Sequence, residues 1–201
     1  MRIVERSLLS RRQTLFLAGA VTCLPASGDD FWNTMPPSEW GVGEIYRLMN
    51  HSPWANTTEW TTGPGFARKN DTNLPGPRVK AVVTWESALP LREALRIPEA
   101  PVYENCYVLG LDGLPSGTYT AEYLRQFARL RATGKSKWTA RATSARERIR
   151  TSSVYQFAFP RTSAPIGPDT EDVYFEMELK PWTLQSKFKP KEMLYHGELA
   201  V

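Results

Sequence analysis

Residues 171–179 read Glu-Asp-Val-Tyr-Phe-Glu-Met-Glu-Leu, and their alternation points to the fold class of the chain. One face of this segment collects the apolar side chains Val173, Phe175, Met177 and Leu179, and most positions on the other face are acidic, as in a strand with one buried side. Further strand patterns occur at residues 78–86, 105–111, 135–142, 153–159, 182–188 and 193–201. Because strands that follow one another through short turns pair antiparallel, the sequence predicts a mostly antiparallel sheet.

Three short helices are predicted beside these strands. They cover residues 39–49, 91–97 and 121–132, and in the last one Tyr123, Leu124, Phe127 and Leu130 share a face. Residues 29–37 read as extended chain, and residues 56–77 read as a loop rich in Gly, Pro, Thr and Asn. The 16 prolines and 13 glycines argue against a bundle of long helices. We therefore expect an α+β fold with two or three short helices packed on one face of the sheet.

The first 28 residues have the three parts of a secretory signal peptide. A basic start is followed by the apolar run 15–24 and by the small residues 26–28. Arg11 and Arg12, with Ser10 before them and Leu15 after, resemble the twin-arginine export signal, and an ordinary secretory signal is the alternative. The predicted organisation is a signal peptide over 1–28, a short helix with a Gly/Pro-rich loop over 29–77, and an α+β domain over 78–201.

This reading places the protein outside the cytoplasm, in the periplasm or the extracellular space. The apolar run of ten residues is shorter than the roughly 20 that span a bilayer, so no transmembrane span is expected in the mature chain. A form anchored by lipid through Cys23 is an alternative, because residues 20–23 partly match a lipid-attachment box. Cleavage after Gly28 would start the mature protein at Asp29.

Positive charge is concentrated in one segment. The whole chain has a formal charge of +4, but residues 125–150 alone carry nine basic residues against one acidic residue. One interpretation of such clustering is an anionic partner, for example an envelope polymer, with Lys135, Lys137, Arg141, Arg146, Arg148 and Arg150 as the candidate binding residues. We favour the other interpretation, a solvated face whose charges pair with acids elsewhere in the fold. We expect no nucleic-acid partner, because no nucleic-acid-binding motif occurs.

Tryptophans crowd into the N-terminal part of the chain. Trp32, Trp40, Trp54 and Trp60 lie within 29 positions. They could form an aromatic platform for a ligand such as a carbohydrate, or they could pin a Gly/Pro-rich segment to the sheet by burial. We favour burial for Trp40 and Trp54, and leave both interpretations open for Trp32 and Trp60.

The sequence shows no motif of catalysis or of metal and cofactor binding. Gly-x-Ser-x-Gly, His-Glu-x-x-His, dinucleotide, phosphate-loop and EF-hand patterns are all missing. The two histidines, His51 and His196, read as surface or capping residues, and Cys106 reads as a buried, inert thiol. The acids between Asp169 and Glu178 read as a solvated strand face. The sequence therefore predicts no catalytic residue, no metal and no cofactor.

Four segments taken together resemble a group of uncharacterised exported bacterial proteins. They are Glu39-Trp40 with Ser52-Pro53-Trp54-Ala55, the run 157–162 with Pro165-Ile166, the run 173–175, and Lys187-Phe188 with Met193 and the run 195–199. The resemblance covers most of residues 31–201. It implies export and a shared fold, and it implies no activity.

The predicted function is therefore that of an exported envelope protein with a non-catalytic binding or structural role. Its partner would be an anionic polymer or another protein. The alternative is a periplasmic hydrolase whose active site matches no known motif. A third interpretation is a subunit that is exported already folded together with a partner.

Overall fold

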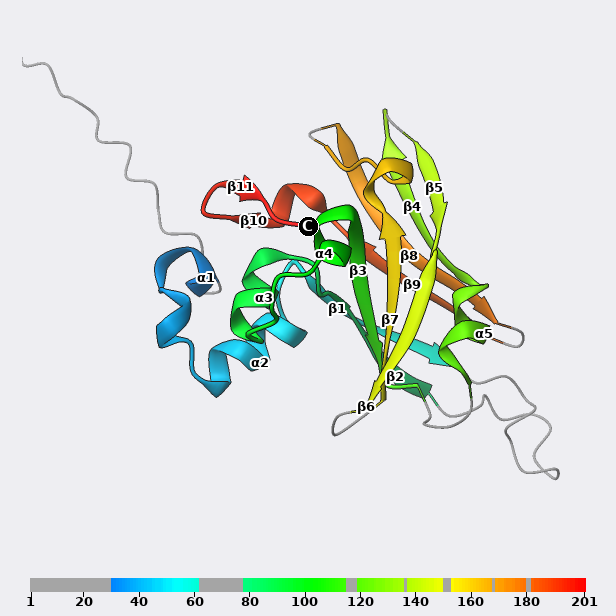
Figure 1. Cartoon of the computed structure of the whole chain (residues 1–201), viewed down its shortest axis with the longest axis horizontal. Coiled ribbons are helices and arrows are strands. Elements are labelled where there is room, and N and C mark those ends of the chain that lie inside the picture. The colour runs from blue at the N-terminus through cyan, green and yellow to red at the C-terminus, as the bar shows by residue number, and fades with distance from the viewer. Residues whose placement is uncertain are drawn as a thin grey trace, which may run out of the picture.

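The computed structural model describes residues 30–61, 78–114, 119–135, 137–149, 153–167, 169–179 and 182–201. Two antiparallel sheets face each other, and short helices gather mainly at one end of them (Figure 1). The predicted α+β class with mostly antiparallel pairing is confirmed. None of the described helices is long and apolar enough to cross a membrane.

The first sheet has five strands in the order β1-β2-β3-β7-β6. Its members are β1 (Ala55–Thr61), β2 (Arg78–Trp85), β3 (Cys106–Asp112), β6 (Ser144–Ile149) and β7 (Ser153–Pro160). The second sheet has the order β5-β4-β8-β9. Its members are β4 (Ala128–Gly134), β5 (Trp138–Arg141), β8 (Thr170–Leu179) and β9 (Trp182–Phe188). A small hairpin of β10 (Leu194–Tyr195) and β11 (Glu198–Leu199) follows.

The two sheets are joined at both edges. On one side β1 lies along β9, where the Asn56 side-chain amide donates to the Lys187 carbonyl at 2.6 Å. On the other side the chain passes from β5 straight into β6. There the Ala142 N–H donates to the Ala128 carbonyl of one sheet, and the Thr143 N–H donates to the Ala158 carbonyl of the other. One continuous segment therefore contributes an edge strand to each sheet.

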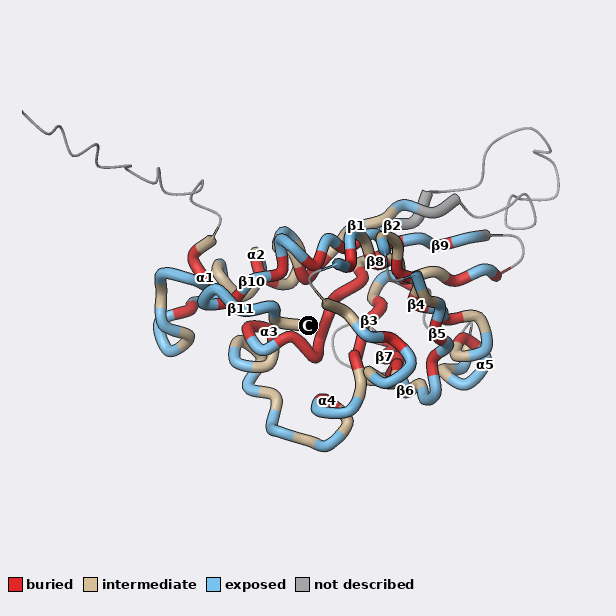
Figure 2. The backbone as a smooth tube through the Cα atoms, turned by 90° about the horizontal axis from the view of Figure 1, so that it is seen from above, coloured by how far each residue is buried: buried red, intermediate tan, exposed pale blue. Residues whose placement is uncertain are grey.

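The inner faces of the sheets enclose one apolar core. The four apolar side chains of β8 that alternate in the sequence are all buried, as predicted, and Figure 2 shows buried and exposed positions alternating along the strands. Aromatic rings bridge the sheets, with Trp85 and Phe188 at 5.3 Å and Phe157 and Phe175 at 5.7 Å between centroids. Large rings fill the gap between two curved sheets with few residues.

The described part of the chain holds five short α-helices, more than the two or three expected. They are α1 (Phe31–Thr34), α2 (Val42–Asn50), α3 (Leu89–Ala94), α4 (Pro101–Asn105) and α5 (Ala121–Arg125), with 3₁₀ turns at Pro37–Glu39, Arg161–Ser163 and Pro190–Glu192. The first three α-helices and the β10–β11 hairpin cluster at one end of the sheets, and α5 lies at the other (Figure 1). The first predicted helix begins at Val42 after Gly41, and not after Ser38.

The predicted helix over 121–132 is wrong after its first five residues. Residues 128–134 form β4, which pairs with β8 on one side and with β5 on the other. Ala128, Leu130 and Ala132 face the core, and Arg129 and Arg131 alternate with them on the outside. Helix propensity is a weak preference, and pairing on both sides of a strand overrides it.

The predicted loop over 56–77 is wrong for residues 56–61. Residues 55–61 form β1, and every residue of this strand has a partner in β2. The segment 29–77 therefore adds a strand to the sheet expected from residues 78–201 alone. Residues 62–77 lie outside the described part of the chain.

Candidate functional site

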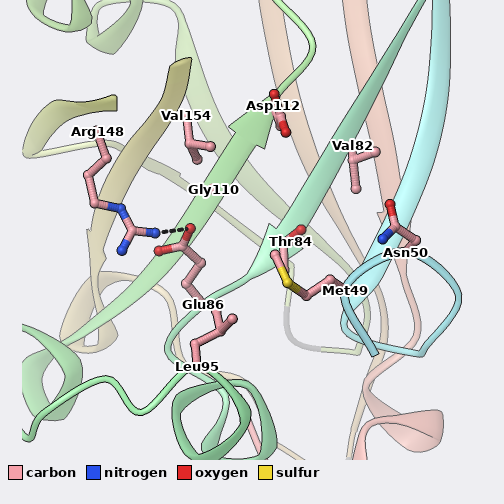
Figure 3. A pocket seen from close by; sticks show the side chains of 10 residues that line it. All are labelled: Met49, Asn50, Val82, Thr84, Glu86, Leu95, Gly110, Asp112, Arg148 and Val154. Carbon is pink, nitrogen blue, oxygen red and sulfur yellow. Dashed lines mark hydrogen bonds and ion pairs between the residues drawn. The ribbon is translucent and has the colours of Figure 1, made fainter. Parts of the chain in front are cut away.

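A pocket lies on the outer face of the five-stranded sheet, beside α2 and α3 (Figure 3). It encloses about 190 Å³, and its polar lining comes from Asn50, Thr84, Glu86, Asp112 and Arg148. Strand alternation places these groups, since Val83 and Trp85 point into the core and their neighbours in β2 point outward. Met49 and Leu95 from the helical end add apolar wall.

Strand register brings the polar residues together. Thr84 of β2 is opposite Gly110 of β3, Gly110 is opposite Gln156 of β7, and Gln156 is opposite Arg146 of β6. These four positions form a row across the sheet. Arg148 lies in the next row, because it is two residues further along β6.

Glu86 is the centre of a hydrogen-bonded network. This residue is only 4% exposed. Its Oε1 accepts from Arg148 Nη2 at 2.7 Å, and its Oε2 accepts from Gln156 Nε2. Gln156 Oε1 in turn accepts from Arg146 Nε. Because an amide carries both a donor and an acceptor, Gln156 links the carboxylate to a second guanidinium.

Gly110 makes room for this carboxylate. A Cβ built on Gly110 would lie 2.5 Å from Glu86 Oε1 and 3.0 Å from its Cδ. Both distances are below ordinary van der Waals contact, so any larger residue would displace the Glu86 side chain. The glycine is therefore part of the site, although it contributes no functional group.

A charged network in this position is costly for a purely structural role. Burying an ion pair removes both charges from water, and well-packed apolar residues often stabilise a fold as much or more. One donor of the network, Arg148 Nε, is buried without a hydrogen-bond partner in the described part of the chain. A buried unpaired donor can be satisfied by an acceptor on a ligand.

The pocket offers both hydrogen-bond donors and hydrogen-bond acceptors close together. Glu86 and Asp112 supply carboxylate oxygens, Arg148 supplies N–H groups, and Thr84 and Asn50 supply groups that donate and accept. Asp112 Oδ1 is oriented by the Gly113 N–H at 2.7 Å. Such a lining suits a ligand group that also donates and accepts, as a hydroxyl does.

The basic residues predicted as a binding stripe are divided between the sheets. Arg146 and Arg148 belong to the Glu86 network. Lys137 and Arg141 are exposed, and Lys135 Nζ lies 3.9 Å from Asp169 Oδ1 with both side chains largely in solvent. The remaining candidate, Arg150, lies outside the described residues.

Other arginines of the segment 125–150 are paired with acids. Arg131 Nη2 lies 2.6 Å from Glu176 Oε1, and Arg125 Nη2 lies 2.6 Å from Glu122 Oε1. Burial raises the pKa of Glu176, but hydrogen bonds from Arg131 and Gln185 outweigh it, and the net pKa is lowered. Part of the segment's charge is thus paired with acids of the same fold.

The two tryptophans left open differ in what the structure shows. Trp32 is 3% exposed and meets the ring of Trp54 edge-on at 5.4 Å, so it is a core residue and not an open platform. Trp40 and Trp54 are buried, as expected, and Trp54 Nε1 donates to the Ala200 carbonyl at 2.6 Å. Trp60 lies in β1, but its side chain is outside the described part of the structure.

Neither histidine lies in the pocket. His51 ends α2 and lines a wide, open groove that also contains Asp30 and Glu192. His196 is exposed in the turn between β10 and β11. Cys106 is partly exposed at the start of β3. Among the described residues, no three His, Cys, Asp or Glu side chains gather as metal ligands would. The export residues Arg11 and Arg12, and Cys23, lie outside the described range.

The sequence indicated Arg148 as a candidate binding residue but not the other residues that line this pocket. The available signal was weak but specific, since Gln156 interrupts the apolar strand Ser153–Pro160 and Glu86 follows directly after β2. Comparisons with protein-family models, with curated proteins and with solved structures found no match for this chain. The resemblance to exported bacterial proteins therefore stays a prediction.

Proposed function

We propose that this protein is an exported, non-catalytic binding protein whose pocket at Glu86 takes a small hydroxyl-rich unit, such as one sugar of an envelope glycan. The observation that carries the proposal concerns Glu86. This charged residue is only 4% exposed, although it lies on the outer face of a sheet, and it lines a pocket there. Gly110, which lies against the Glu86 side chain, leaves the space that the carboxylate needs.

The charge of the site supports an uncharged ligand. Glu86 and Arg148 neutralise each other across 2.7 Å, and Asp112 is the third charged side chain of the lining. A sugar hydroxyl can donate to Asp112 and accept from the Arg148 guanidinium, and the apolar side chains of Met49 and Leu95 suit its C–H groups. Because no net ion pairing is needed, we expect affinity to depend little on salt.

Calorimetric titration of the purified protein with neutral, aminated and acidic oligosaccharides tests this proposal. We expect binding of a neutral sugar, lost in Gly110→Ala and retained in Gly43→Ala, whose added methyl meets no atom within 4 Å. Glu86→Gln should weaken binding, and Glu198→Gln on an exposed strand should not. Unchanged affinity in folded Gly110→Ala protein would refute the pocket as the binding site.

An anionic envelope polymer is the second candidate partner. It is favoured by the exposure of Lys137 and Arg141 and by the position of Arg141 opposite Arg129 in the sheet. Binding of this kind would weaken steeply with salt, and a Lys137→Ala/Arg141→Ala variant would lose it while the Gly110→Ala variant would keep it. The two variants therefore separate the two partners.

A hydrolase remains the alternative, because Glu86 and Asp112 place two carboxylates in one pocket. Both Glu86 oxygens already accept hydrogen bonds, from Arg148 and Gln156, which argues against this carboxylate as a proton donor or nucleophile. Release of new reducing ends from a bound oligosaccharide, abolished in Asp112→Asn, would favour the hydrolase over simple binding.

Export is part of the proposal and has its own test. N-terminal sequencing of the protein recovered from the envelope should give a chain that begins at Asp29. A protein recovered only from the cytoplasm with Met1 intact would contradict export, and a lipid-modified Cys23 at the N-terminus would support the anchored form.

A further inference from the structure

We propose a second sugar-binding site, on the outer side of the four-stranded sheet, built on the aromatic side chains Tyr123 and Phe127, with Tyr119 stacked on Tyr123. This inference takes its ligand class from the proposed function and extends it to a different surface. The site lies beside α5, at the end of the molecule opposite to α1, α2 and α3 (Figure 1).

The aromatic group is ordered by local structure. Thr120 caps α5, with its Oγ1 accepting from the Tyr123 N–H at 3.2 Å. The buried Tyr155 donates its hydroxyl to the Tyr119 carbonyl at 3.0 Å. The helix ends at Arg125 because β4 begins at Ala128, so Phe127 is held in the short connection between them.

The rings form a partly exposed surface. Tyr119 and Tyr123 lie parallel, with centroids 5.9 Å apart and planes 5° from each other. Phe127 meets Tyr123 at 5.1 Å with its plane tilted by 58°. Tyr123 is 44% exposed, although Tyr119 and Phe127 both contact its ring.

Polar groups flank the aromatic surface in a hollow of about 440 Å³. Its lining joins Tyr123 and Phe127 to Arg129, Glu176 and Glu178. Glu176 is fixed by Arg131 and by the Gln185 amide at 2.8 Å. Glu178, by contrast, is exposed at the rim. The hollow therefore brings aromatic side chains together with carboxylate acceptors and a guanidinium donor.

This combination fits a sugar ring better than an organic cation. One face of a sugar ring is a patch of C–H bonds that can lie on an aromatic ring, and its hydroxyls reach carboxylates and a guanidinium at the edge. A quaternary ammonium would also find an aromatic face and carboxylates, but it would meet the like charge of Arg129. The volume is within the usual range for small-ligand pockets.

Titration of the full-length protein with neutral tetrasaccharides tests the second site, with tetramethylammonium as the cation probe. We expect Tyr123→Ala to weaken sugar binding about tenfold and Tyr123→Phe to preserve it, because the phenylalanine ring keeps the stacking surface. The matched control is Tyr46→Ala, which removes a more exposed tyrosine on α2, 60% against 44%, and should change nothing. Glu178→Gln should also weaken binding, and circular dichroism confirms that each variant is folded.

The outcomes separate this site from the pocket at Glu86. Weakening by Tyr123→Ala alone supports the second site and contradicts the first, and weakening by Gly110→Ala alone does the reverse. Weakening by both supports two sites. Sugar binding that survives folded Tyr123→Ala unchanged, or a site that takes tetramethylammonium and no sugar, overturns this inference.

Discussion

Replacing Gly110 by alanine gives the sharpest test of the Glu86 network. The added Cβ would lie 2.5 Å from Glu86 Oε1, 3.0 Å from Cδ and 3.3 Å from Cγ, so its three nearest atoms all belong to one side chain. Since carbon atoms prefer contacts of about 3.5–4.0 Å, the carboxylate must move by about 1 Å. That shift weakens the hydrogen bonds from Arg148 and Gln156 together.

The expected destabilisation follows from these contacts. A hydrogen bond to a charged group contributes about 1.5–3 kcal/mol, and overpacking a filled site costs about 1–3 kcal/mol. Alanine also lowers the entropy of the unfolded chain, which stabilises by about 0.4–1 kcal/mol. Because the carboxylate can retreat partly toward the pocket, only part of each cost applies, and we expect the free energy of unfolding to fall by about 2 kcal/mol.

Urea denaturation followed by tryptophan fluorescence measures this change, and a double-mutant cycle assigns its cause. In a Glu86→Ala background the alanine at 110 has space, so Gly110→Ala should cost little there and the coupling should be about 2 kcal/mol. Gly43→Ala in α2 controls for the entropy term and should stabilise by about 0.5–1 kcal/mol. An equal cost of Gly110→Ala with and without the Glu86 side chain would refute the reasoning.

Three further changes test other parts of the structure. Gln156→Glu puts a second carboxylate against Glu86, so unfolding in urea should become easier by about 2–3 kcal/mol at pH 7, with partial recovery at pH 5 as the pair gains a proton. Glu176→Gln tests the ion pair with Arg131. Because the pKa of Glu176 is lowered in the folded protein, this ion pair stabilises the fold at pH values above 4.5, the ordinary pKa of the group. The contribution is lost as the pH falls through the lowered pKa of the folded state. The difference in unfolding free energy between this variant and the wild type should therefore shrink in acid, and a difference that stays constant with pH would contradict this role of the ion pair. Gly113→Ala should lower the melting temperature clearly, because φ is +97° and the new Cβ would strike a backbone carbonyl of β2, and an unchanged melting temperature would show that this turn relaxes.

The strands with large apolar side chains could be predicted from the sequence. In β8 the alternation of Val173, Phe175 and Met177 predicted a strand with one buried face. The structure extends this strand by a single residue. The bounds of β2, β3, β7 and β9 also lie within one residue of the prediction. Period-2 patterns of large residues are informative because a shift by one position would expose all of them.

The strand β4, which places small residues in the core, escaped prediction. In β4 the inward positions are Ala128, Leu130 and Ala132, and Arg129 and Arg131 stand between them. Alanine, leucine and arginine are good helix formers, so residues 121–132 read as one amphipathic helix. Only the pairing of β4 with two neighbours decides the outcome, and pairing between distant segments cannot be read from a single sequence.

The same limit explains why the pocket was missed. Glu86 and Gln156 are 70 residues apart, and they meet because β2, β3 and β7 lie side by side with Gly110 between them. The sequence shows each residue as an isolated polar position. Register across three strands turns them into a site.

The division of the basic segment between two sheets changes what its charge can do. Residues 142–143 carry the chain from one sheet to the other, so Arg131 finds Glu176 on the second sheet and Arg148 finds Glu86 on the first. A dense run of arginines in the sequence is therefore not a dense patch of free charge on the surface. Because Arg148 is held by a carboxylate that also lines the pocket, this arginine contributes more to shaping a neutral hydrogen-bonding site than to attracting an anion from solution.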